Sequence, residues 1–230
     1  MPLTLSFGAG GWIGGCYHLG VVKAFRECLD LSDVHASGCS AGAYAAVSIF
    51  FKPEVSVDEL FKNFTDVLEK LPTIPFMAEN SLRQLVSSTL SSGTLNNSIF
   101  NNLYLSVSRF GLTSLTNEIR TKFNNWYEIE DSVIESSMIP FIIGVNLKYT
   151  DGWLTKNILK FNSNTLIINF ITCDGDITPS GNVNLMYCFI KPSTKECERM
   201  YDMGYKDAKR YLKKIYHISK YIQKKKISNN

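Results

Sequence analysis

Over the first fifty residues, short segments typical of β-strands alternate with segments whose apolar residues recur at helical spacing. Residues 3–7 predict a short buried strand, and residues 34–38 predict a second one. A glycine-rich run at residues 8–15 leads into apolar positions at helical spacing as far as Leu29, and residues 41–51 form a small-residue helix. This order predicts parallel strands with right-handed crossovers, so the loops after the two strands should meet.

The pattern continues as alternating helices and strands to the end of the chain. Ser56 and Glu59 form a capping box, and an apolar stripe up to Pro72 predicts a core or lid helix. Helices are also expected at 82–90, 99–110 and 127–136, a hairpin at 112–116 with 119–123, strands at 147–150 and 166–172, and a basic helix at about 199–225. The predicted fold class is α/β.

Length and composition are those of one globular domain. The 230 residues are 45% hydrophobic and 20% charged, so we expect a single domain over residues 1–230. The start has neither a basic nor an apolar signal region, and the longest apolar stretch is too short to span a bilayer. We therefore expect a cytoplasmic protein. Six cysteines without C-x-x-C spacing predict reduced thiols and neither a metal site nor a disulfide framework.

The net charge of +3 hides an uneven distribution. Residues 206–226 hold nine Lys or Arg and one Asp, which leaves the rest of the chain at −5. Such a segment is typical of a solvated helix or of a helix that meets anionic lipid headgroups, and the same electrostatics would also attract nucleic acid. We expect a solvated helix or a peripheral contact with a membrane or lipid droplet, and no nucleic-acid partner.

A candidate nucleophile lies between the second strand and the helix that follows it. The sequence Gly38-Cys39-Ser40-Ala41-Gly42 matches G-x-S-x-G. In that context the serine is held in a strained turn that exposes its hydroxyl, and the glycines let neighbouring backbone approach. Ser40 is therefore the candidate nucleophile, and Cys39 is interpreted as a small turn residue.

The first glycine run is a candidate oxyanion hole. Glycines at 8, 10, 11 and 14 let backbone N–H groups turn outward, and each such donor stabilises an oxyanion by roughly 3 to 4 kcal/mol. A dinucleotide-binding loop is the alternative. However, Gly8 to Gly14 fits G-x-G-x-x-G only with a one-residue misfit, and Glu27 and Asp30 come too early to bind a ribose.

A candidate base follows another strand-like run. Asp151-Gly152 lies 111 residues beyond Ser40, and a buried carboxylate whose pKa rises from ~3.9 towards neutrality can accept a serine proton without a histidine. A second pair, Asp174-Gly175, is interpreted as a turn.

The three histidines leave one alternative open. His18 and His35 fall in a helix and a strand, where packing is the expected role. The order Ser40, Asp151, His217 is that of an α/β-hydrolase triad. Against a triad, only one strand precedes the strand that leads to Ser40, and His217 lies among lysines.

Five segments resemble, in the same order, the patatin-like phospholipases, and especially the adiponutrin and adipose triglyceride lipase subgroup. They are "SFGAGGWIGGCYHLGVVKAF", "GCSAGAYAA", "SSMIPFIIG...YTDGW" and, more weakly, "CDGDITPSGNV" and "MGYKDAKRYL". The resemblance implies a three-layer α/β/α fold and a lipid acyl hydrolase with a Ser-Asp dyad and no metal or cofactor. It further implies Ser40 as nucleophile, Asp151 as base, and Gly10, Gly11 and Ala41 as oxyanion donors.

Two positions depart from the family's usual pattern. Trp153 follows Asp151-Gly152 where a glycine or alanine is usual, and Ala9 stands where a glycine often does. If the Trp153 position required a positive φ, the indole would add strain of about 1 kcal/mol or more. We expect instead that Trp153 forms a wall of the acyl site.

The expected function is hydrolysis of lipid acyl esters at a lipid surface. Phospholipids and acylglycerols both fit, and a lipid acceptor in place of water would make a transacylase. Residues 52–97 are expected to form a lid that sets specificity. The alternatives are the triad esterase and a lipid-surface binding protein of the same fold that has lost turnover.

Overall fold

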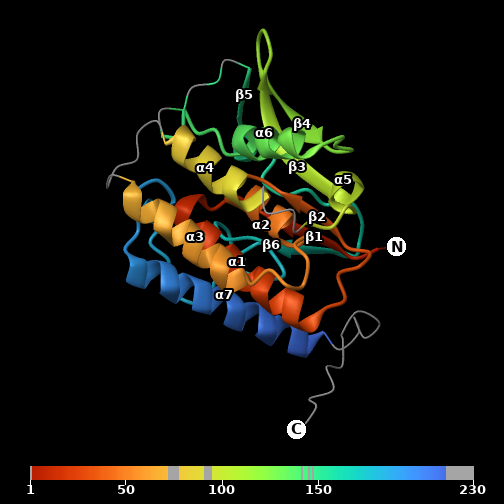
Figure 1. The fold of residues 1–230 in the computed structure, drawn as a ribbon. Helices are drawn as coiled ribbons and strands as arrows, with labels where there is room; N and C mark the ends of the chain where they lie inside the picture. The colour runs from red at the N-terminus through yellow and green to blue at the C-terminus, as the bar shows by residue number, and fades with distance from the viewer. Residues whose placement is uncertain are drawn as a thin grey trace.

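A six-stranded mixed sheet, flanked by helices, organises the described residues (Figure 1). The computed structural model describes residues 2–71, 78–90, 95–140, 142–144, 146 and 148–215, without the side chains of 89 and 90. The strands are β1 (Thr4–Phe7), β2 (His35–Gly38), β3 (Leu103–Phe110), β4 (Leu115–Arg120), β5 (Tyr149–Asp151) and β6 (Thr165–Ile168). Most pairings are parallel, which confirms the α/β class and is consistent with a three-layer α/β/α fold.

The helices lie mainly between the strands in the chain order. They are α1 (Gly11–Cys28), α2 (Ala41–Ser48), α3 (Val57–Lys70), α4 (Glu79–Leu90), α5 (Ile99–Asn102), α6 (Trp126–Ser136) and α7 (Thr194–Lys214), with the 3-10 helices η1 (Gly152–Leu154) and η2 (Leu185–Cys188). None of the helices in the described part of the chain is long and apolar enough to cross a membrane.

The sheet register brings the ends of β2 and β5 together. The strand order is β4-β3-β2-β1-β6, and β5 also pairs with β3. Gly38 of β2 lies opposite Leu105, and Asp151 of β5 lies opposite Val107, two residues further along β3. Because β4 occupies the other edge of β3 at Val107, β5 continues the line of β2 where β2 ends. The chain leaves β2 for Ser40 at the same level as Asp151.

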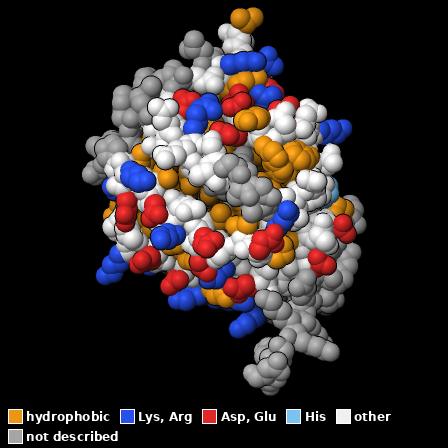
Figure 2. All heavy atoms as spheres, in the orientation of Figure 1, with side chains coloured by type: hydrophobic (Ala, Val, Ile, Leu, Met, Phe, Trp, Pro, Cys, Tyr) orange, Lys and Arg blue, Asp and Glu red, His pale blue; other side chains and the backbone are white. Residues whose placement is uncertain are grey.

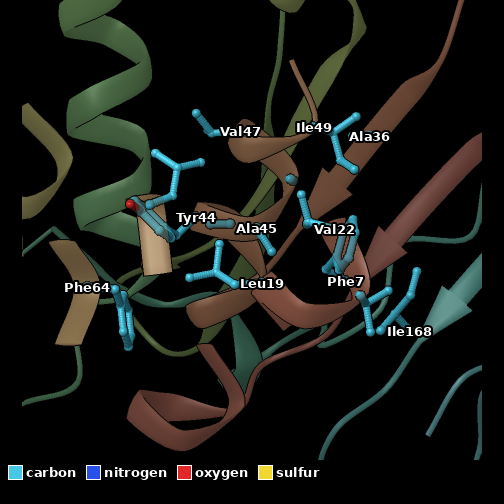
Figure 3. Close-up of a cluster of buried hydrophobic side chains, with 14 of the residues drawn as sticks. Phe7, Leu19, Val22, Ala36, Tyr44, Ala45, Val47, Ile49, Phe64 and Ile168 are labelled. Carbon is cyan, nitrogen blue, oxygen red and sulfur yellow. The ribbon is translucent and has the colours of Figure 1, made fainter. Parts of the chain in front are cut away.

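The core lies between the sheet and the helices α1 and α2. Figure 3 shows side chains of β1, β6, α1 and α2 gathered in one cluster, with Phe7 and Ile168 from the strands and Leu19 and Val22 from α1. Burial of such side chains is the main favourable term in folding.

Polar contacts join the outer helix α7 to α1, since the Tyr205 hydroxyl donates to Glu27 at 2.7 Å.

The predicted helix at 99–110 is wrong. Only the single turn α5 is helical, and β3 begins at Leu103. The apolar residues Leu103, Leu105 and Val107 recur with the period of two that a strand requires, and β3 pairs on both edges. The predicted hairpin of residues 112–116 with 119–123 is also wrong, because the hairpin in the structure pairs β3 with β4.

Other element ends differ by a few residues. The helix expected at 41–51 ends at Ser48, and the strand expected at 166–172 is β6, which ends at Ile168. Asn169 ends β6 because its side-chain amide donates to Thr172 Oγ1 at 2.6 Å and bends the chain. The Ser56 hydroxyl caps α3 as predicted, although it accepts from the N–H of Asp58.

The basic terminal helix begins earlier than expected. Ser193 caps α7 by accepting from the N–H of Glu196, and the helix ends at Lys214 with Ile215 as its C-cap, short of the predicted end at about 225. The remainder of the predicted helix, at 216–225, lies outside the described residues.

Candidate active site

Ser40 lies on a strained turn between β2 and α2. β2 ends at Gly38 and α2 begins at Ala41, and Ser40 has φ 55° and ψ −127°. A non-glycine residue in a sparsely populated region costs about 1–3 kcal/mol, and such strain is found at active sites where the surroundings enforce it. This strand–serine–helix arrangement is the one that G-x-S-x-G predicts.

Gly42 allows this turn to approach the glycine-rich loop. A Cβ at Gly42 would lie 2.3 Å from the carbonyl oxygen of Phe7 and 2.5 Å from that of Gly8. No side chain fits at that distance, so α2 reaches the end of β1 only because this residue is glycine. The two loops therefore meet, as the strand order predicts.

The end of α6 fixes the backbone on both sides of the site. The N–H of Ser40 donates to Ser136 Oγ at 3.0 Å, and Ser136 Oγ donates to the carbonyl of Ser106 at 2.7 Å. The N–H of Asp151 donates to the Met138 carbonyl at 3.0 Å. Ser136 is buried, and sequence reasoning missed its role because its partner lies 96 residues away.

Asp151 is buried, and the pKa of its carboxyl group is raised towards neutral pH. Burial raises the pKa of Asp151 to about 6, against the lowering effects of the Ser40 hydroxyl, the Trp153 N–H and the Cys39 thiol. The Trp153 N–H lies 2.8 Å from Oδ1 and the Cys39 sulfur lies 3.8 Å from the same oxygen.

The Ser40 and Asp151 side chains are neighbours without a fully formed hydrogen bond. The serine hydroxyl lowers the pKa of the carboxyl, yet no hydrogen bond of ordinary geometry joins the two side chains among the described residues. Catalytic contacts in ligand-free sites are commonly long and tighten when substrate binds. The two side chains are therefore close enough for the serine hydroxyl to affect the carboxyl group.

Two residues that line the space beside Ser40 have backbone N–H groups available as candidate oxyanion donors. Gly11 and Ala41 line the same pocket as Ser40, and within the described ranges neither N–H has an acceptor. Gly11 has φ 56°, and a Cβ there would lie 2.0 Å from the Cys188 carbonyl oxygen, so glycine is required. Gly10, also a predicted donor, is absent from the described lining of this pocket.

The remaining glycines of the motifs belong to the backbone around the site. Gly8 lies at the end of β1, where its N–H donates to the Ile168 carbonyl at 2.9 Å. Gly14 donates its N–H to Gly10 in the first turn of α1. Gly152 begins η1 directly after Asp151.

The two described histidines do not serve Ser40. His18 Nε2 lies 2.8 Å from the Gly8 carbonyl oxygen, and burial lowers the pKa of His18 to about 4. The ring is therefore neutral and supports the glycine-rich loop. His35 contacts the Tyr104 hydroxyl at 3.2 Å. His217, the histidine of the alternative triad, lies outside the described residues.

An apolar pocket opens beside Ser40. The empty space there, open solvent included, is about 470 Å³, and the larger side chains that line it are aromatic or aliphatic: Trp12, Tyr44, Phe64, Leu82, Leu85, Ile139, Ile142 and Ile143. Three of these come from the stretch 52–97 that was expected to form a lid. Such a lining suits an apolar chain better than a polar substrate.

Trp153 is not the wall of the acyl site that the sequence predicts. It lies in η1 without a positive φ, so its size causes no backbone strain. Its indole is half-exposed and is absent from the described lining of the pocket, where Trp12 stands instead. Asp174-Gly175 lies in a turn after β6, as predicted.

Comparison with known proteins shows weak likeness to solved structures. Neither a family model nor a curated protein sequence matches this chain. Among solved structures it is similar to VipD from Legionella pneumophila, with 13% identity and a TM-score of 0.49. The match covers 93% of this chain and 66% of that chain. At this level the likeness concerns the arrangement of the fold alone.

Proposed function

We propose that this protein is a patatin-like serine acyl hydrolase that cleaves lipid acyl esters with Ser40 and Asp151. The observation that carries the proposal is the buried carboxylate of Asp151, whose pKa is raised to about 6, beside a serine held at positive φ. A base with that pKa is largely ionised at neutral pH and is basic enough to take a serine proton in the transition state. The apolar pocket beside Ser40 supports a lipid chain as the acyl group.

In the first half of the proposed reaction, Ser40 Oγ attacks the ester carbonyl carbon while its proton passes to Asp151. The carbonyl oxygen becomes an oxyanion and accepts hydrogen bonds from the Gly11 and Ala41 N–H groups. The tetrahedral intermediate then expels the alcohol, which takes the proton from Asp151. An acyl-Ser40 ester remains, and Asp151 is again a carboxylate.

In the second half, water replaces the alcohol. Asp151 accepts a proton from water, the resulting hydroxide attacks the acyl-Ser40 carbonyl, and the same two N–H groups stabilise the oxyanion. Collapse returns the proton to Ser40 Oγ and releases a fatty acid. The Ser40 N–H does not stabilise the oxyanion, because it already donates to Ser136 Oγ.

Fatty-acid release tests the proposal directly. The full chain is incubated with phospholipid vesicles and with triacylglycerol emulsions, and its serine is probed with a fluorophosphonate. Release from at least one lipid class and covalent labelling of Ser40 are expected. No release from either class together with no labelling would leave the lipid-binding alternative.

Ser136→Ala is expected to lower kcat about tenfold with little change in KM, and to lower the free energy of unfolding by about 1–3 kcal/mol. The Ser40 N–H would lose its buried acceptor, and the strained turn would lose its tie to α6. Steady-state kinetics on a soluble ester and urea unfolding measure the two effects.

The matched control is Ser132→Ala, on the same helix. Its hydroxyl donates only to the Glu128 carbonyl one turn earlier, so turnover should be unchanged. Equal kcat in wild type and Ser136→Ala would show that Ser136 does not position Ser40.

A further inference from the structure

Polar side chains of β3, β4 and the segment after η1 form a hydrogen-bonded group next to Asp151. In the register of β3 and β4, Ser108 lies opposite Asn117, so the Asn117 side chain stands on the same face of the sheet as those of Ser106 and Ser108. Both serines are fully buried, and Asn117 is half-buried. Thr155 directly follows η1 and completes the group, which we call the Asn117 network. Buried hydroxyl groups need hydrogen-bond partners, so the direction of each hydrogen can be followed.

The hydrogens of the Asn117 network run towards the Asp151 carbonyl. Asn117 Nδ2, which carries two hydrogens, lies 2.8 Å from Ser106 Oγ and 3.1 Å from Thr155 Oγ1. Ser108 Oγ donates its only hydrogen to the Asp151 carbonyl at 2.7 Å. Thr155 Oγ1 lies 2.8 Å from Ser108 Oγ and is therefore the donor of that pair. One line of hydrogen bonds thus leads from the amide to the backbone of the proposed base.

Asn117 occupies a position that requires a double donor. The Ser106 hydroxyl already donates its hydrogen to the Lys156 carbonyl at 2.8 Å, so it can only accept from Asn117. Thr155 likewise only accepts, because its one hydrogen is already donated. The Val107 carbonyl lies 3.4 Å from the same Nδ2 and has no hydrogen to give. A carboxylate of the same shape would face the lone pairs of these oxygens without a hydrogen between them.

The same part of β3 also holds the backbone of Ser40. The Ser106 carbonyl accepts from Ser136 Oγ, and Ser136 Oγ accepts the Ser40 N–H. Gly152 packs so closely on β3 that a Cβ there would lie 2.1 Å from the Ser106 carbonyl oxygen. The backbones of both members of the proposed dyad are therefore held against one short segment of β3.

We propose that Asn117 is a positioning residue for the base of the dyad. It keeps the Thr155 and Ser108 hydrogens directed at the Asp151 carbonyl, and so fixes the peptide that carries the carboxylate relative to the nucleophile. A displacement of about 1 Å at such a site can lower turnover about a hundredfold. The effect on turnover rests on the proposed function, whereas the hydrogen-bond network does not.

Asn117→Asp in the full chain tests this role, because it keeps the shape of the side chain and removes both donated hydrogens. We expect kcat for a water-soluble short-chain ester to fall about tenfold to a hundredfold, with KM nearly unchanged. Ser108→Ala removes the direct donor to Asp151 and should act in the same way, with the double variant little worse than either single one. Ser108→Ala also provides the comparison if Asn117→Asp does not fold.

Asn164→Asp is the matched control for the change in charge. It makes the same substitution at an exposed residue directly before β6 and should leave kcat unchanged. Acidic and basic side chains are already interspersed over the β3–β4 hairpin (Figure 2), where Glu118 pairs with Arg109 and Arg120. A loss in Asn117→Asp therefore reports the missing hydrogens.

Hydrogen exchange measured by NMR gives a readout that needs no turnover. The Trp153 N–H donates to Asp151 Oδ1 at 2.8 Å, so its exchange rate reports how firmly the carboxylate is held. Asn117→Asp should raise that rate about tenfold and leave the amides of β1 unchanged.

The outcomes separate this role from the proposed chemistry. Wild-type kcat in a folded Asn117→Asp or Ser108→Ala variant would overturn the proposal, and so would equal increases in exchange at Trp153 and across β1. If wild type does not hydrolyse the ester, the proposed function fails, while the exchange rates still decide whether Asn117 holds Asp151.

Discussion

Ser40→Ala and Asp151→Asn are each expected to lower kcat/KM for lipid esters by about 10⁴-fold or more. Ser40→Ala removes the nucleophile, and Asp151→Asn leaves the serine hydroxyl with a neighbour that cannot accept its proton as a base. Nucleophile and base act as a unit, so the double variant should be little worse than either single one. Fatty-acid release under single-substrate conditions measures the loss, with circular dichroism to show that each variant folds.

The second Asp-Gly pair provides a matched control. Asp174→Asn makes the same chemical change in an exposed turn after β6 and should leave kcat/KM unchanged. His217→Ala tests the triad directly. A loss of activity with His217→Ala, or an Asp151→Asn variant as active as wild type, would contradict the dyad.

The parts of the site that follow from local sequence were predicted well. The turn at Ser40 needs only a strand, a serine between small residues and a helix, and all lie within a dozen residues. The meeting of the two loops follows from the handedness of parallel crossovers, which does not depend on side chains. Local pattern and general topology were therefore sufficient for the first fifty residues.

The parts that depend on distant partners were not predictable. β3 was predicted as part of a helix, although Leu103, Leu105 and Val107 alternate with Tyr104, Ser106 and Ser108 as a strand requires. Ser106 and Ser108 are buried because their hydroxyls donate to carbonyls distant in the chain, as Ser108 Oγ donates to the Asp151 carbonyl at 2.7 Å, and local sequence does not show such partners. Ser136 was missed for the same reason. Which glycine faces the pocket, Gly10 or Gly11, depends on the exact start of α1, and sequence patterns do not resolve helix starts to one residue.

The pH dependence of turnover should follow the ionisation of Asp151. Only the carboxylate form accepts the serine proton, and the pKa of Asp151 is raised to about 6. We expect kcat/KM for a neutral ester to rise about tenfold per pH unit below that value and to level off above it. Activity that stays constant from pH 4.5 to 8 would contradict a base of this kind. His18 gives no competing step near neutrality, because its pKa is lowered to about 4.

The same pKa predicts that Asp151 destabilises the fold when it is ionised. In the unfolded chain the carboxyl has its ordinary pKa of 3.8, whereas burial raises the pKa of Asp151 to about 6 in the folded protein. The folded state binds this proton more tightly, so the contribution of Asp151 to stability falls as the pH rises from about 3.8 to about 6. Above that window the fold carries a cost of roughly 3 kcal/mol, from about 1.4 kcal/mol per pKa unit.

Asp151→Asn should therefore stabilise the protein while abolishing its activity. The amide is neutral at every pH, so at pH 8 we expect its free energy of unfolding to exceed that of wild type by up to about 3 kcal/mol. The difference should shrink below pH 6 and vanish near pH 4. Urea unfolding at pH 8, 6 and 4 measures it, with Asp174→Asn as the control that gains nothing. A variant less stable than wild type at pH 8 would show that the buried charge is better compensated than its contacts with Ser40, Trp153 and Cys39 indicate. A gain in stability confined to neutral and alkaline pH would instead show that burying the ionised carboxylate costs stability. The same burial raises the pKa of Asp151 to the value that the proposed reaction requires.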